Sequence, residues 1–500
     1  LDAQGQPARA VSRWAALNAR LQTGIVNALD EAILAADRSD TAGVSKLDEI
    51  PYDFFRKRLS VVVEERQAGG ALMITKGALD KVLEVCVSVR QGADILPLDE
   101  ARRAAIQALF SGWSAKGFRV LGLAVKEVPG KAAYTAKEDE TGLHFAGFLL
   151  FFDPPKEDAG PTIRRLADLG VQVKIITGDN RLVARHVAGT LGLDEASVLP
   201  AEEIARLSSD AFAQVAERTS IFAEVDPNQK EQIILALKKR GHVVGYMGDG
   251  INDAPALHAA DIGVSVDSAV DVAKEAADFV LLRQDLSVLL AGIREGRRTF
   301  ANTLKYIYTT TSANFGNMIS MAGASLFLPF LPLLAKQILL NNFLSDFPAA
   351  GIPGDRVDEE LLQSPQRWNV KAIRAFMIVF GLVSSLFDFA TFFLLLVVAR
   401  AGEARFQTGW FVESLLSELA IALVVRTRRV FFRSRPGRLL WVITLLVALL
   451  TLLLPYLPFA GALGFTPLPF WLMAMLAGIT ALYVLVTELV KRMYFKKFTN

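Results

Sequence analysis

The sequence predicts an α/β soluble portion followed by an all-α bundle of membrane-spanning helices, and three observations support this fold class. Hydrophobic residues make up 52% of the 500 positions while charged residues still make up 21%, which indicates two unlike portions rather than one uniform composition. Up to about residue 295, short apolar runs alternate with charged helical stretches, as in soluble α/β domains. Beyond that residue, apolar stretches reach roughly 20 residues, the length that crosses a bilayer as a helix.

Length and charge narrow the function classes. A chain of 500 residues is longer than one hydrophobic core usually serves, so we expect several domains. The formal net charge of +2 gives no basic surplus for a nucleic-acid partner. Cys86 is the only cysteine, which excludes an internal disulfide, and its apolar neighbours indicate a small core residue. The four histidines show no metal-ligand spacing, and we interpret them as structural.

The C-terminal half contains six candidate membrane spans, at 306–330, 333–352, 375–399, 408–425, 439–459 and 467–489. Lys and Arg are numerous after the second span, after the fourth span and in the C-terminal tail, whereas the alternate loops contain only Arg400 and Arg405. Because cytoplasmic loops carry an excess of Lys and Arg, both ends of the six-span region are expected in the cytoplasm. A buried soluble helix bundle would not explain this asymmetry.

The most specific motif is Met247-Gly-Asp-Gly-Ile-Asn-Asp-Ala-Pro255, which follows a strand-like apolar run at 242–247. Asp249 would lie at the carboxyl end of that strand, where ligands bind in open α/β sheets. Asp249 and Asp253 form a carboxylate pair that suits Mg²⁺, and Asn252 adds a donor for a phosphoryl oxygen. An acidic surface turn is the alternative interpretation, which the length of the motif disfavours.

Two further segments add phosphoryl-binding groups. The apolar run 171–176 predicts a strand that ends at Thr177, Gly178 and Asp179, where a hydroxyl and backbone N–H groups precede a helix. Lys230 opens an apolar-periodic helix and would neutralise charge on a transferring phosphoryl group. In this order the segments resemble the second to fourth motifs of the haloacid dehalogenase superfamily. The resemblance implies phosphoryl transfer through an aspartyl-phosphate and Mg²⁺.

Within that superfamily, the chain resembles the P-type ATPases. The run 247–282 resembles their hinge segment, and Asp153-Pro-Pro resembles the motif that joins their two cytoplasmic domains. Lys76-Gly77-Ala78 resembles their adenine-pocket motif, with Pro51-Tyr52-Asp53-Phe54 before it and Gly117-Phe118-Arg119 after it. The resemblance therefore implies an ATP site formed by Tyr52, Lys76, Gly77, Arg119 and Asp153.

Side-chain chemistry fits this nucleotide site. The ring of Tyr52 can stack on adenine, while Lys76 and Arg119 can offer positive charge to phosphates. A half-buried strand aromatic is the alternative interpretation of Tyr52. The resemblance further implies three domains. They are an α+β nucleotide-binding domain at 1–140, truncated at its N-terminus, a haloacid dehalogenase-like Rossmann phosphorylation domain at 141–295, lacking its nucleophile strand, and a membrane domain at 296–500.

The resemblance is closest to the bacterial magnesium-importing, type III-B branch. It rests on the runs Ser312–Asn317, Leu328–Pro332, Asn342–Asp346, Phe387-Asp-Phe and Gln407–Ser414. Branch membership implies Mg²⁺ as the transported cation. In related pumps the position of Asn317 carries a carboxylate, so the amide here lowers the negative charge of the site.

Polar residues inside the predicted spans make physical sense as a cation path, since ionisable residues in a bilayer are costly and usually functional. Asn342 and Asp346 share one helix face, as do Asn314 and Asn317 on the preceding span. Glu413 lies in the fourth span, one turn before Ser417. These oxygens suit a hard cation. Polar contacts between helices are the alternative interpretation, which we favour for Asp388.

The motif Asp-Lys-Thr-Gly-Thr, which carries the phosphorylated aspartate of the family, does not occur in the sequence. We therefore expect a fragment that lacks this aspartate, the actuator domain and the first four membrane helices. The predicted whole is an ATP-driven, magnesium-transporting P-type ATPase of the bacterial inner membrane, with ATP and Mg²⁺ as cofactors and with cytoplasmic soluble domains and C-terminus. By itself the chain is expected to bind nucleotide without pumping.

Three alternatives stay open at this point. The first is a pump for another cation, such as Ca²⁺, Ni²⁺ or H⁺. The second is a phosphatase of the haloacid dehalogenase type whose helices act as an anchor, which is disfavoured because one span is enough for an anchor. The third is a non-catalytic membrane protein that binds nucleotide.

Overall fold

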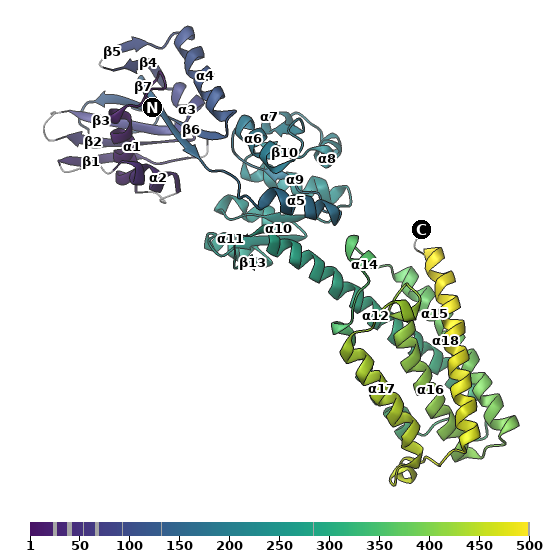
Figure 1. The fold of residues 1–500 in the computed structure, drawn as a ribbon. Helices are drawn as coiled ribbons and strands as arrows, with labels where there is room; N and C mark the ends of the chain where they lie inside the picture. The colour runs from purple at the N-terminus through teal and green to yellow at the C-terminus, as the bar shows by residue number, and fades with distance from the viewer. Residues whose placement is uncertain are drawn as a thin grey trace. The chain divides into compact units, whose positions relative to one another are not determined.

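The computed structural model describes residues 1–23, 28–37, 43–53, 55–65, 70–92, 94–131, 133–283 and 285–498. This part of the chain divides into two compact units. One contains residues 1–164 and 172–286, and the other contains residues 165–171 and 287–500. All of the described strands belong to the first unit, while the second is helical (Figure 1).

A seven-stranded sheet forms the first half of the first unit. Its strand order is β1-β2-β3-β6-β7-β4-β5, with β4 and β7 parallel and all other neighbours antiparallel. The strands are β1 (Val44–Ile50), β2 (Arg58–Glu65), β3 (Ala71–Ala78), β4 (Cys86–Gln91), β5 (Asp94–Pro97), β6 (Phe118–Val128) and β7 (Leu143–Phe152). Because β7 pairs in this sheet, the sheet continues to Phe152, beyond the predicted domain boundary at residue 140.

Helices cover both faces of this sheet. They are α1 (Arg9–Leu21), α2 (Ala28–Ala36), α3 (Leu79–Leu83) and α4 (Glu100–Ser114). On one face, Val11 and Leu17 of α1 share a core with Val61 and Ile74 of the sheet. On the other face, α3 and α4 pack against a core that includes Cys86, which is buried as the sequence predicts. The strands are apolar runs in the sequence because helices cover both faces of the sheet.

The second half of the first unit alternates short parallel strands with helices. Its elements are α5 (Ala159–Asp168), β8 (Ile175–Ile176), α6 (Arg181–Leu191), β9 (Val198–Pro200), α7 (Ala201–Ile204), α8 (Ser209–Arg218), β10 (Ile221–Ala223), α9 (Pro227–Lys239), β11 (Gly245–Met247), η1 (Ile251–Asp253), α10 (Ala254–Ala259), β12 (Ile262–Val266), α11 (Asp271–Ala276) and β13 (Phe279–Leu281). They form two parallel sheets, in the orders β8-β10-β9 and β11-β12-β13. This is the predicted α/β class.

Two strands are shorter than the apolar runs that predict them. The run 171–176 yields the two residues of β8, and the run 242–247 yields the three residues of β11. Both are edge strands of their three-stranded sheets, so each has one neighbour to supply ladder hydrogen bonds. Hydrophobicity in the sequence predicts which segment is buried, whereas the length of a strand depends on how far the neighbouring strand pairs with it.

The helical unit contains long helices joined by short turns (Figure 1). The elements are α12 (Leu286–Ala324), α13 (Ala335–Ala349), η2 (Ile352–Gly354), α14 (Glu359–Gln363), α15 (Val370–Phe393), η3 (Leu394–Val398), α16 (Glu403–Val425), η4 (Phe431–Arg433), α17 (Arg438–Leu453), η5 (Leu454–Tyr456), η6 (Ala460–Leu463) and α18 (Phe470–Phe498). Helix α16 is central, since it contacts α13, α15, α17 and α18.

In the part of the chain that the structure describes, four helical segments are long and apolar enough to cross a membrane. They are Val370–Val398, Glu403–Val425, Arg438–Tyr456 and Phe470–Lys496. The other two predicted spans fall on α12 and α13. Helix α12 carries a polar stripe, and the 15 residues of α13 are fewer than a bilayer requires. For these two helices, membrane crossing stays a prediction.

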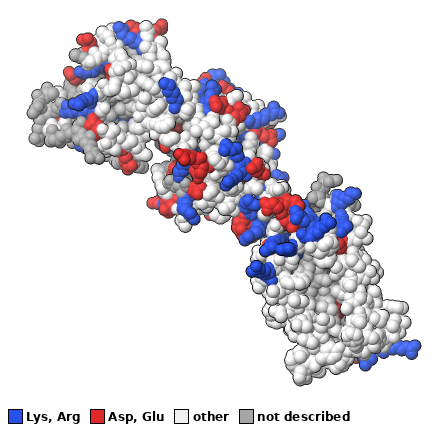
Figure 2. All heavy atoms as spheres, viewed as in Figure 1, with Lys and Arg blue, Asp and Glu red and all other residues white. Residues whose placement is uncertain are grey.

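Charge is distributed unevenly over the helical unit. On the face in Figure 2, Lys, Arg, Asp and Glu gather at one end, and the sides of the helices are almost free of charge. The exposed side chains on those sides include Leu382, Leu386, Leu445 and Leu485. Lipid tails would cover such a surface without desolvating charge.

Candidate functional site

Asp253 is the best-connected carboxylate of the predicted phosphoryl site. Its Oδ1 accepts hydrogen bonds from Lys230 Nζ and from the Tyr246 hydroxyl, both at 2.7 Å. Its Oδ2 accepts the backbone N–H groups of Gly250, at 3.0 Å, and of Asp249, at 3.2 Å. The side chain is buried. Both oxygens therefore have donors within the protein.

Two local features allow Asp253 to occupy this position. A Cβ atom at position 248 would lie 2.5 Å from the Asp253 Cβ, so only glycine permits the turn to close. Burial acts to raise the pKa of the Asp253 carboxyl, but hydrogen bonds from Lys230 and Tyr246 outweigh it and hold the pKa below its ordinary value. Asp253 is thus a stable anion that orients Lys230 and the Asp249 loop.

Helix α9 presents Lys230 from its first turn, as the sequence predicts. The helix begins with a capping box, in which Asp226 accepts the Gln229 backbone N–H at 2.8 Å and Gln229 Oε1 accepts the Asp226 N–H at 3.0 Å. Pro227 occupies the first helical position, where its missing N–H costs nothing. This start of the helix fixes where Lys230 meets Asp253.

Asp249 and Asn252 differ from Asp253 in being exposed. One glycine separates Asp249 from the end of β11. The Asp249 carboxylate makes no hydrogen bond or ion pair with any described residue. Mg²⁺ in proteins takes one or two carboxylates and completes its shell with phosphate oxygens and waters. Asp249 fits that role, whereas Asp253 does not, because donors already occupy both of its oxygens. No group of three or more His, Cys, Asp or Glu in the described ranges is arranged as a metal cluster.

Thr177, Gly178 and Asp179 lie between β8 and α6. The Asp179 N–H donates to Thr177 Oγ1 at 3.0 Å, and Asn180 caps α6 by accepting the Leu182 N–H at 2.8 Å. Gly178 is exposed, so the loop backbone is open to a ligand. This arrangement supplies a hydroxyl and backbone donors before a helix N-terminus, which suits a phosphoryl group.

The residues predicted to bind ATP are only partly brought together. Arg119, exposed on β6, forms an ion pair with Asp179 at 3.3 Å between Nε and Oδ1. Tyr52 lies near Arg119: burial raises the pKa of the Tyr52 hydroxyl, and the Arg119 charge partly opposes this. Asp153 is exposed directly after β7. Phe54 of the predicted motif lies outside the described residues.

Lys76 and Gly77 lie on β3, and both contribute to the packing of the seven-stranded sheet. Lys76 is buried and forms an ion pair with Asp30 of α2. A Cβ at Gly77 would lie 2.4 Å from the Lys57 carbonyl oxygen, so glycine is needed for that close approach. Lys76 therefore shares its charge with a protein carboxylate, whereas Tyr52 and Arg119 are more accessible.

Helix α13 presents two polar faces in the helical unit. Asn342 and Asp346, the predicted cation ligands, are both exposed. The adjacent Asn341 is buried, and its Nδ2 donates to Glu418 Oε1 of α16 at 3.2 Å. Neither Asn341 nor Glu418 is among the predicted cation ligands.

Glu418 also receives a hydrogen bond from Asn317 Nδ2 of α12. Asn317 Oδ1 in turn accepts the Ser414 hydroxyl at 3.4 Å. Asn314, which the sequence placed on the same face as Asn317, is exposed. The amides of two helices thus converge on one carboxylate of the central helix.

A pair of acids lies between α15 and α16. Asp388 is buried and accepts the Ser320 hydroxyl at 2.6 Å and the Trp410 indole N–H at 2.8 Å. Glu413 is buried and accepts the Ser417 hydroxyl one turn further along α16. Glu413 Oε2 has no hydrogen-bond partner among the described residues. The saturated contacts of Asp388 agree with the predicted structural role.

Two residues without a predicted role lie at polar sites in the structure. Tyr246 lies in an apolar strand-like run, and its hydroxyl donates to Asp253 of the motif that follows. Glu418 lies on α16 with Glu413, which the sequence did single out. The five-residue spacing places the two acids about 140° apart on α16, so they serve different faces. The signal was available, since any ionisable residue inside a span is a candidate.

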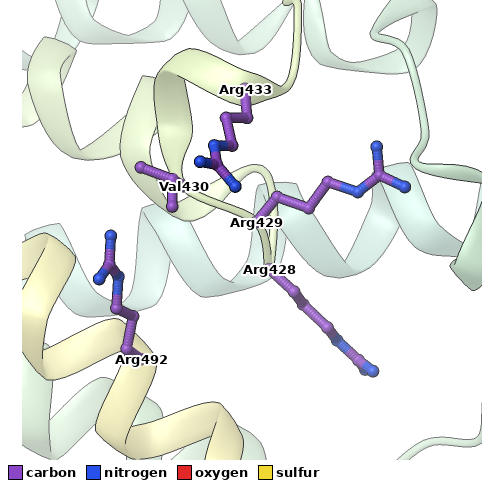
Figure 3. Close-up of a pocket in the computed structure, with 5 residues that line it drawn as sticks. All are labelled: Arg428, Arg429, Val430, Arg433 and Arg492. Carbon is purple, nitrogen blue, oxygen red and sulfur yellow. The ribbon is translucent and has the colours of Figure 1, made fainter.

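A basic pocket of about 680 Å³ lies at one end of the helical unit (Figure 3). Arg428, Arg429 and Arg433 come from the loop after α16, and Arg492 comes from α18. The loop after the fourth predicted span and the C-terminal tail therefore lie at the same end of the bundle. Arg429 is paired with Glu360, and Arg428 lies 5.4 Å from the Phe495 ring centroid.

Three family models match the chain. Residues 17–158 match the cytoplasmic domain N of P-type ATPases, residues 124–261 match haloacid dehalogenase-like hydrolases, and residues 330–493 match the C-terminus of cation-transporting ATPases. Together they cover the nucleotide residues, the phosphoryl site and helices α13 to α18.

Known proteins resemble the chain over nearly its whole length. A magnesium-transporting ATPase, P-type 1, of Salmonella typhimurium is 45% identical over 99% of this chain and 56% of the relative. The protein of the same name from Escherichia coli K12 shows the same values. A calcium-transporting ATPase of Bacillus subtilis is 28% identical over 84% of the chain and 49% of that protein. The chain thus spans about half the length of the relatives it matches.

Proposed function

Since this chain belongs to the P-type ATPase family over the length that it spans, we propose that it forms the nucleotide-binding, phosphoryl-transfer and C-terminal membrane part of a pump that carries Mg²⁺. The observation that carries the proposal is the arrangement around Asp253. A buried carboxylate holds Lys230 at 2.7 Å and receives the backbone of the loop that exposes Asp249. That arrangement lies at the carboxyl end of β11, where α/β sheets bind ligands.

Each side chain then has a distinct role in phosphoryl transfer. Thr177 and the backbone around Gly178 bind phosphoryl oxygens, and Lys230 offsets the negative charge that develops on them. Asn252, exposed beside Asp249, donates to the same group. Asp253 is a positioning residue, because its oxygens contact Lys230 and the loop rather than the substrate. Asp249 would hold Mg²⁺, which supplies positive charge between phosphoryl oxygens when bound.

The phosphoryl acceptor in this proposal is an aspartate outside the sequence. Strands β8 and β11 each form the edge of a three-stranded parallel sheet, and each is followed by one of the phosphoryl-binding segments. Parallel strands end at the same edge of a sheet, so a strand paired with these edges would deliver its last residues beside Thr177 and Asp249. We expect the acceptor aspartate at the end of such a strand.

ATP would dock on the seven-stranded sheet near Tyr52, with Arg119 towards the phosphates. The ion pair of Arg119 with Asp179, at 3.3 Å, supports this direction, because it brings a predicted nucleotide residue to the predicted phosphoryl loop. An exposed ion pair of this kind is weak, so exchange of Asp179 for a phosphate costs little. Lys76 stabilises the site through Asp30.

Mg²⁺ as cargo and a cytoplasmic location of the soluble unit are part of the same proposal. The two 45%-identical relatives are magnesium transporters, which supports the cargo. The shared basic pocket supports the orientation, because the loop after α16 and the tail carry the Arg residues that the positive-inside rule places in the cytoplasm (Figure 3). The bacterial inner membrane is the expected location.

A chimera tests this function directly. The chain is joined to the portion of the Salmonella relative that it does not match, and the product is expressed in a bacterium without Mg²⁺ importers. We expect growth at low Mg²⁺ and a phosphoenzyme from radiolabelled ATP. Asp249→Asn should abolish both. The matched control is Asp267→Asn, an exposed aspartate that follows β12.

The outcomes separate the alternatives. A chimera that binds ATP but forms no phosphoenzyme would support the nucleotide-binding protein without catalysis. A phosphoenzyme whose breakdown responds to Ca²⁺, without growth at low Mg²⁺, would support a pump for another cation. Normal phosphoenzyme in Asp249→Asn would contradict the role of Asp249.

A further inference from the structure

Glu140 is a fully buried acid on the loop that joins β6 to β7. Its Oε2 accepts hydrogen bonds from Arg56 Nη1 and from Arg58 Nε, both at 2.8 Å. Its Oε1 accepts the Ser60 hydroxyl at 2.6 Å. Two guanidinium groups thus share one carboxylate that lies 84 and 82 positions away from them in the chain.

Arg56 connects this buried carboxylate to the segment that carries Tyr52. Arg56 Nη2 donates to the Pro51 carbonyl oxygen at 2.6 Å, and Arg56 Nε pairs with the Asp53 carboxylate. Asp53 Oδ1 also accepts the backbone N–H groups of Phe55 and Arg56, both at 2.8 Å. These bonds close a turn, residues 51–53 and 55–57, which we call the Tyr52 turn.

Backbone bonds at Lys57 hold the other end of the Tyr52 turn. Lys57 has a φ of 48°, a left-handed conformation that a residue other than glycine adopts at a cost. Its N–H donates to the Asp53 carbonyl oxygen and its own carbonyl accepts the Ala78 N–H, both at 2.9 Å. Such a conformation persists only where the surroundings hold it. The start of the turn, at Pro51, is held through Arg56.

We propose that Glu140 is a positioning residue of the nucleotide site, which holds the Tyr52 turn through Arg56 in the arrangement that stacks on adenine. The proposal rests on the proposed function, because the turn affects ATP only if Tyr52 contacts it. Bonds between a guanidinium and a carboxylate are stronger than neutral ones, so one buried acid can order an exposed turn. A turn that is ordered before ATP arrives loses less entropy on binding.

A purely structural role makes a different prediction. If Glu140 only balances the buried Arg58 of β2, its loss lowers the stability of the sheet and reduces the amount of folded protein. The folded molecules would still bind ATP with unchanged affinity. If Glu140 acts through the turn, affinity falls, and the fall depends on the presence of the Tyr52 ring.

The experiment uses the full chain, purified in detergent, and trinitrophenyl-ATP as the probe. A titration gives both the affinity and the number of sites per chain. Glu140→Gln is compared with Glu138→Gln, the same exchange at an exposed position of the same loop. Arg56→Lys is a second variant, because it keeps the positive charge but cannot bridge Glu140, Asp53 and Pro51 at once.

We expect Glu140→Gln and Arg56→Lys each to weaken affinity about fivefold, with the number of sites unchanged. Glu138→Gln should have no effect. In a Tyr52→Ala background, Glu140→Gln and Arg56→Lys should each add less than about twofold, because coupled residues are not additive. Wild-type affinity in both variants would overturn the proposal. So would a full fivefold loss in the Tyr52→Ala background, or fewer sites of unchanged affinity.

Hydrogen exchange without nucleotide separates this proposal from the proposed function. Glu140→Gln and Arg56→Lys should speed exchange in peptides covering 51–58, while Glu138→Gln should not. Faster exchange in a chain whose wild type binds no trinitrophenyl-ATP would contradict the nucleotide site and support the hold on the turn. Unchanged exchange and affinity in a chain that binds the probe would contradict the positioning role alone.

Discussion

The soluble and helical units each hold a carboxylate at a polar centre, and they balance its charge in different ways. Asp253 accepts an ammonium group, a phenol and two backbone N–H groups. Glu418 accepts amide groups and has no basic partner among the described side chains. The first carboxylate is complete within the protein and positions its neighbours. The second is held by neutral donors from two neighbouring helices.

Asp355 shows that this difference is not a matter of which unit a residue belongs to. It lies in the helical unit after η2 and is fully buried, yet it pairs with Lys305 at 2.6 Å and lies 3.5 Å from Arg426. The Gly437 N–H donates to its other oxygen at 2.7 Å. Asp355 therefore joins α12, the end of α16 and the start of α17 as a structural tie. Asp253 and Asp355 are thus held by a built-in counter-ion, whereas Asp388 is held by a hydroxyl and an indole N–H.

The largest effect is expected at this tie. Asp355→Ala leaves the buried Lys305 and Arg426 without their shared anion, which should lower the local free energy of opening by about 3–5 kcal/mol. Hydrogen exchange of the peptides around 298–309 and 435–442 measures this loss. Asp358→Ala is the matched control, because Asp358 accepts only hydroxyl groups, from Thr427 and Ser434. Equal exchange in Asp355→Ala and wild type would contradict the tie.

A smaller loss is expected when Asp253 loses its ammonium partner. Lys230→Met leaves a buried carboxylate with neutral donors, which should cost about 2–3 kcal/mol at neutral pH, measured by hydrogen exchange of peptides across 245–260. In wild type the pKa of Asp253 is lowered. Its contribution to stability is therefore present above the ordinary pKa and lost as pH falls through the folded-state value.

The pH dependence of this variant is weaker than that of wild type. Without Lys230, the Asp253 carboxyl loses a partner that lowers its pKa, so the pKa lies above the wild-type value. The deficit relative to wild type should shrink as pH is lowered from 7 towards about 5. A deficit that stays constant over this range would show that Lys230 stabilises the loop by packing rather than by charge.

Sequence reasoning succeeded where a motif and an element boundary coincide. The Lys230 helix start is signalled by Asp226, Pro227 and Gln229, all local features that the structure uses as a capping box. The α/β class and the helical second half also follow from local periodicity. The sheet boundary was less accessible, because β7 joins the first sheet through pairing with β6 and β4, partners distant in sequence.

In the helical unit, periodicity predicted which residues share a face but not which face is buried. Asn342 and Asp346 do share a face, and it is the exposed one. The buried face contains Asn341, whose neighbour Glu418 lies on a helix 77 positions away. Contacts of that separation depend on how helices pack, and a polar residue in an apolar span fits either orientation.

A modest effect is expected at the nucleotide site. Tyr52→Ala removes a ring that is about half exposed, and should weaken binding of a fluorescent ATP analogue about fivefold to tenfold through lost stacking. Phe55→Ala is the control, since Phe55 is 94% exposed and comes from the same segment. Equal weakening by both variants would indicate a general disturbance of the segment rather than stacking by Tyr52.

The smallest effect on stability is expected at Glu418. Glu418→Gln keeps the shape of the side chain and one carbonyl acceptor, and removes a charge that no basic residue balances. Because Glu418 is half-buried and has only amide donors, the free energy of unfolding in detergent should change by less than about 1 kcal/mol, in either direction. The same exchange at a tied acid, Asp355→Asn, should be clearly destabilising.

The comparison can fail at Glu418 itself. If Glu418→Gln destabilises the chain as strongly as Asp355→Asn, Glu418 is a structural contact between helices, and the difference between carboxylates with and without a basic partner has no consequence for stability.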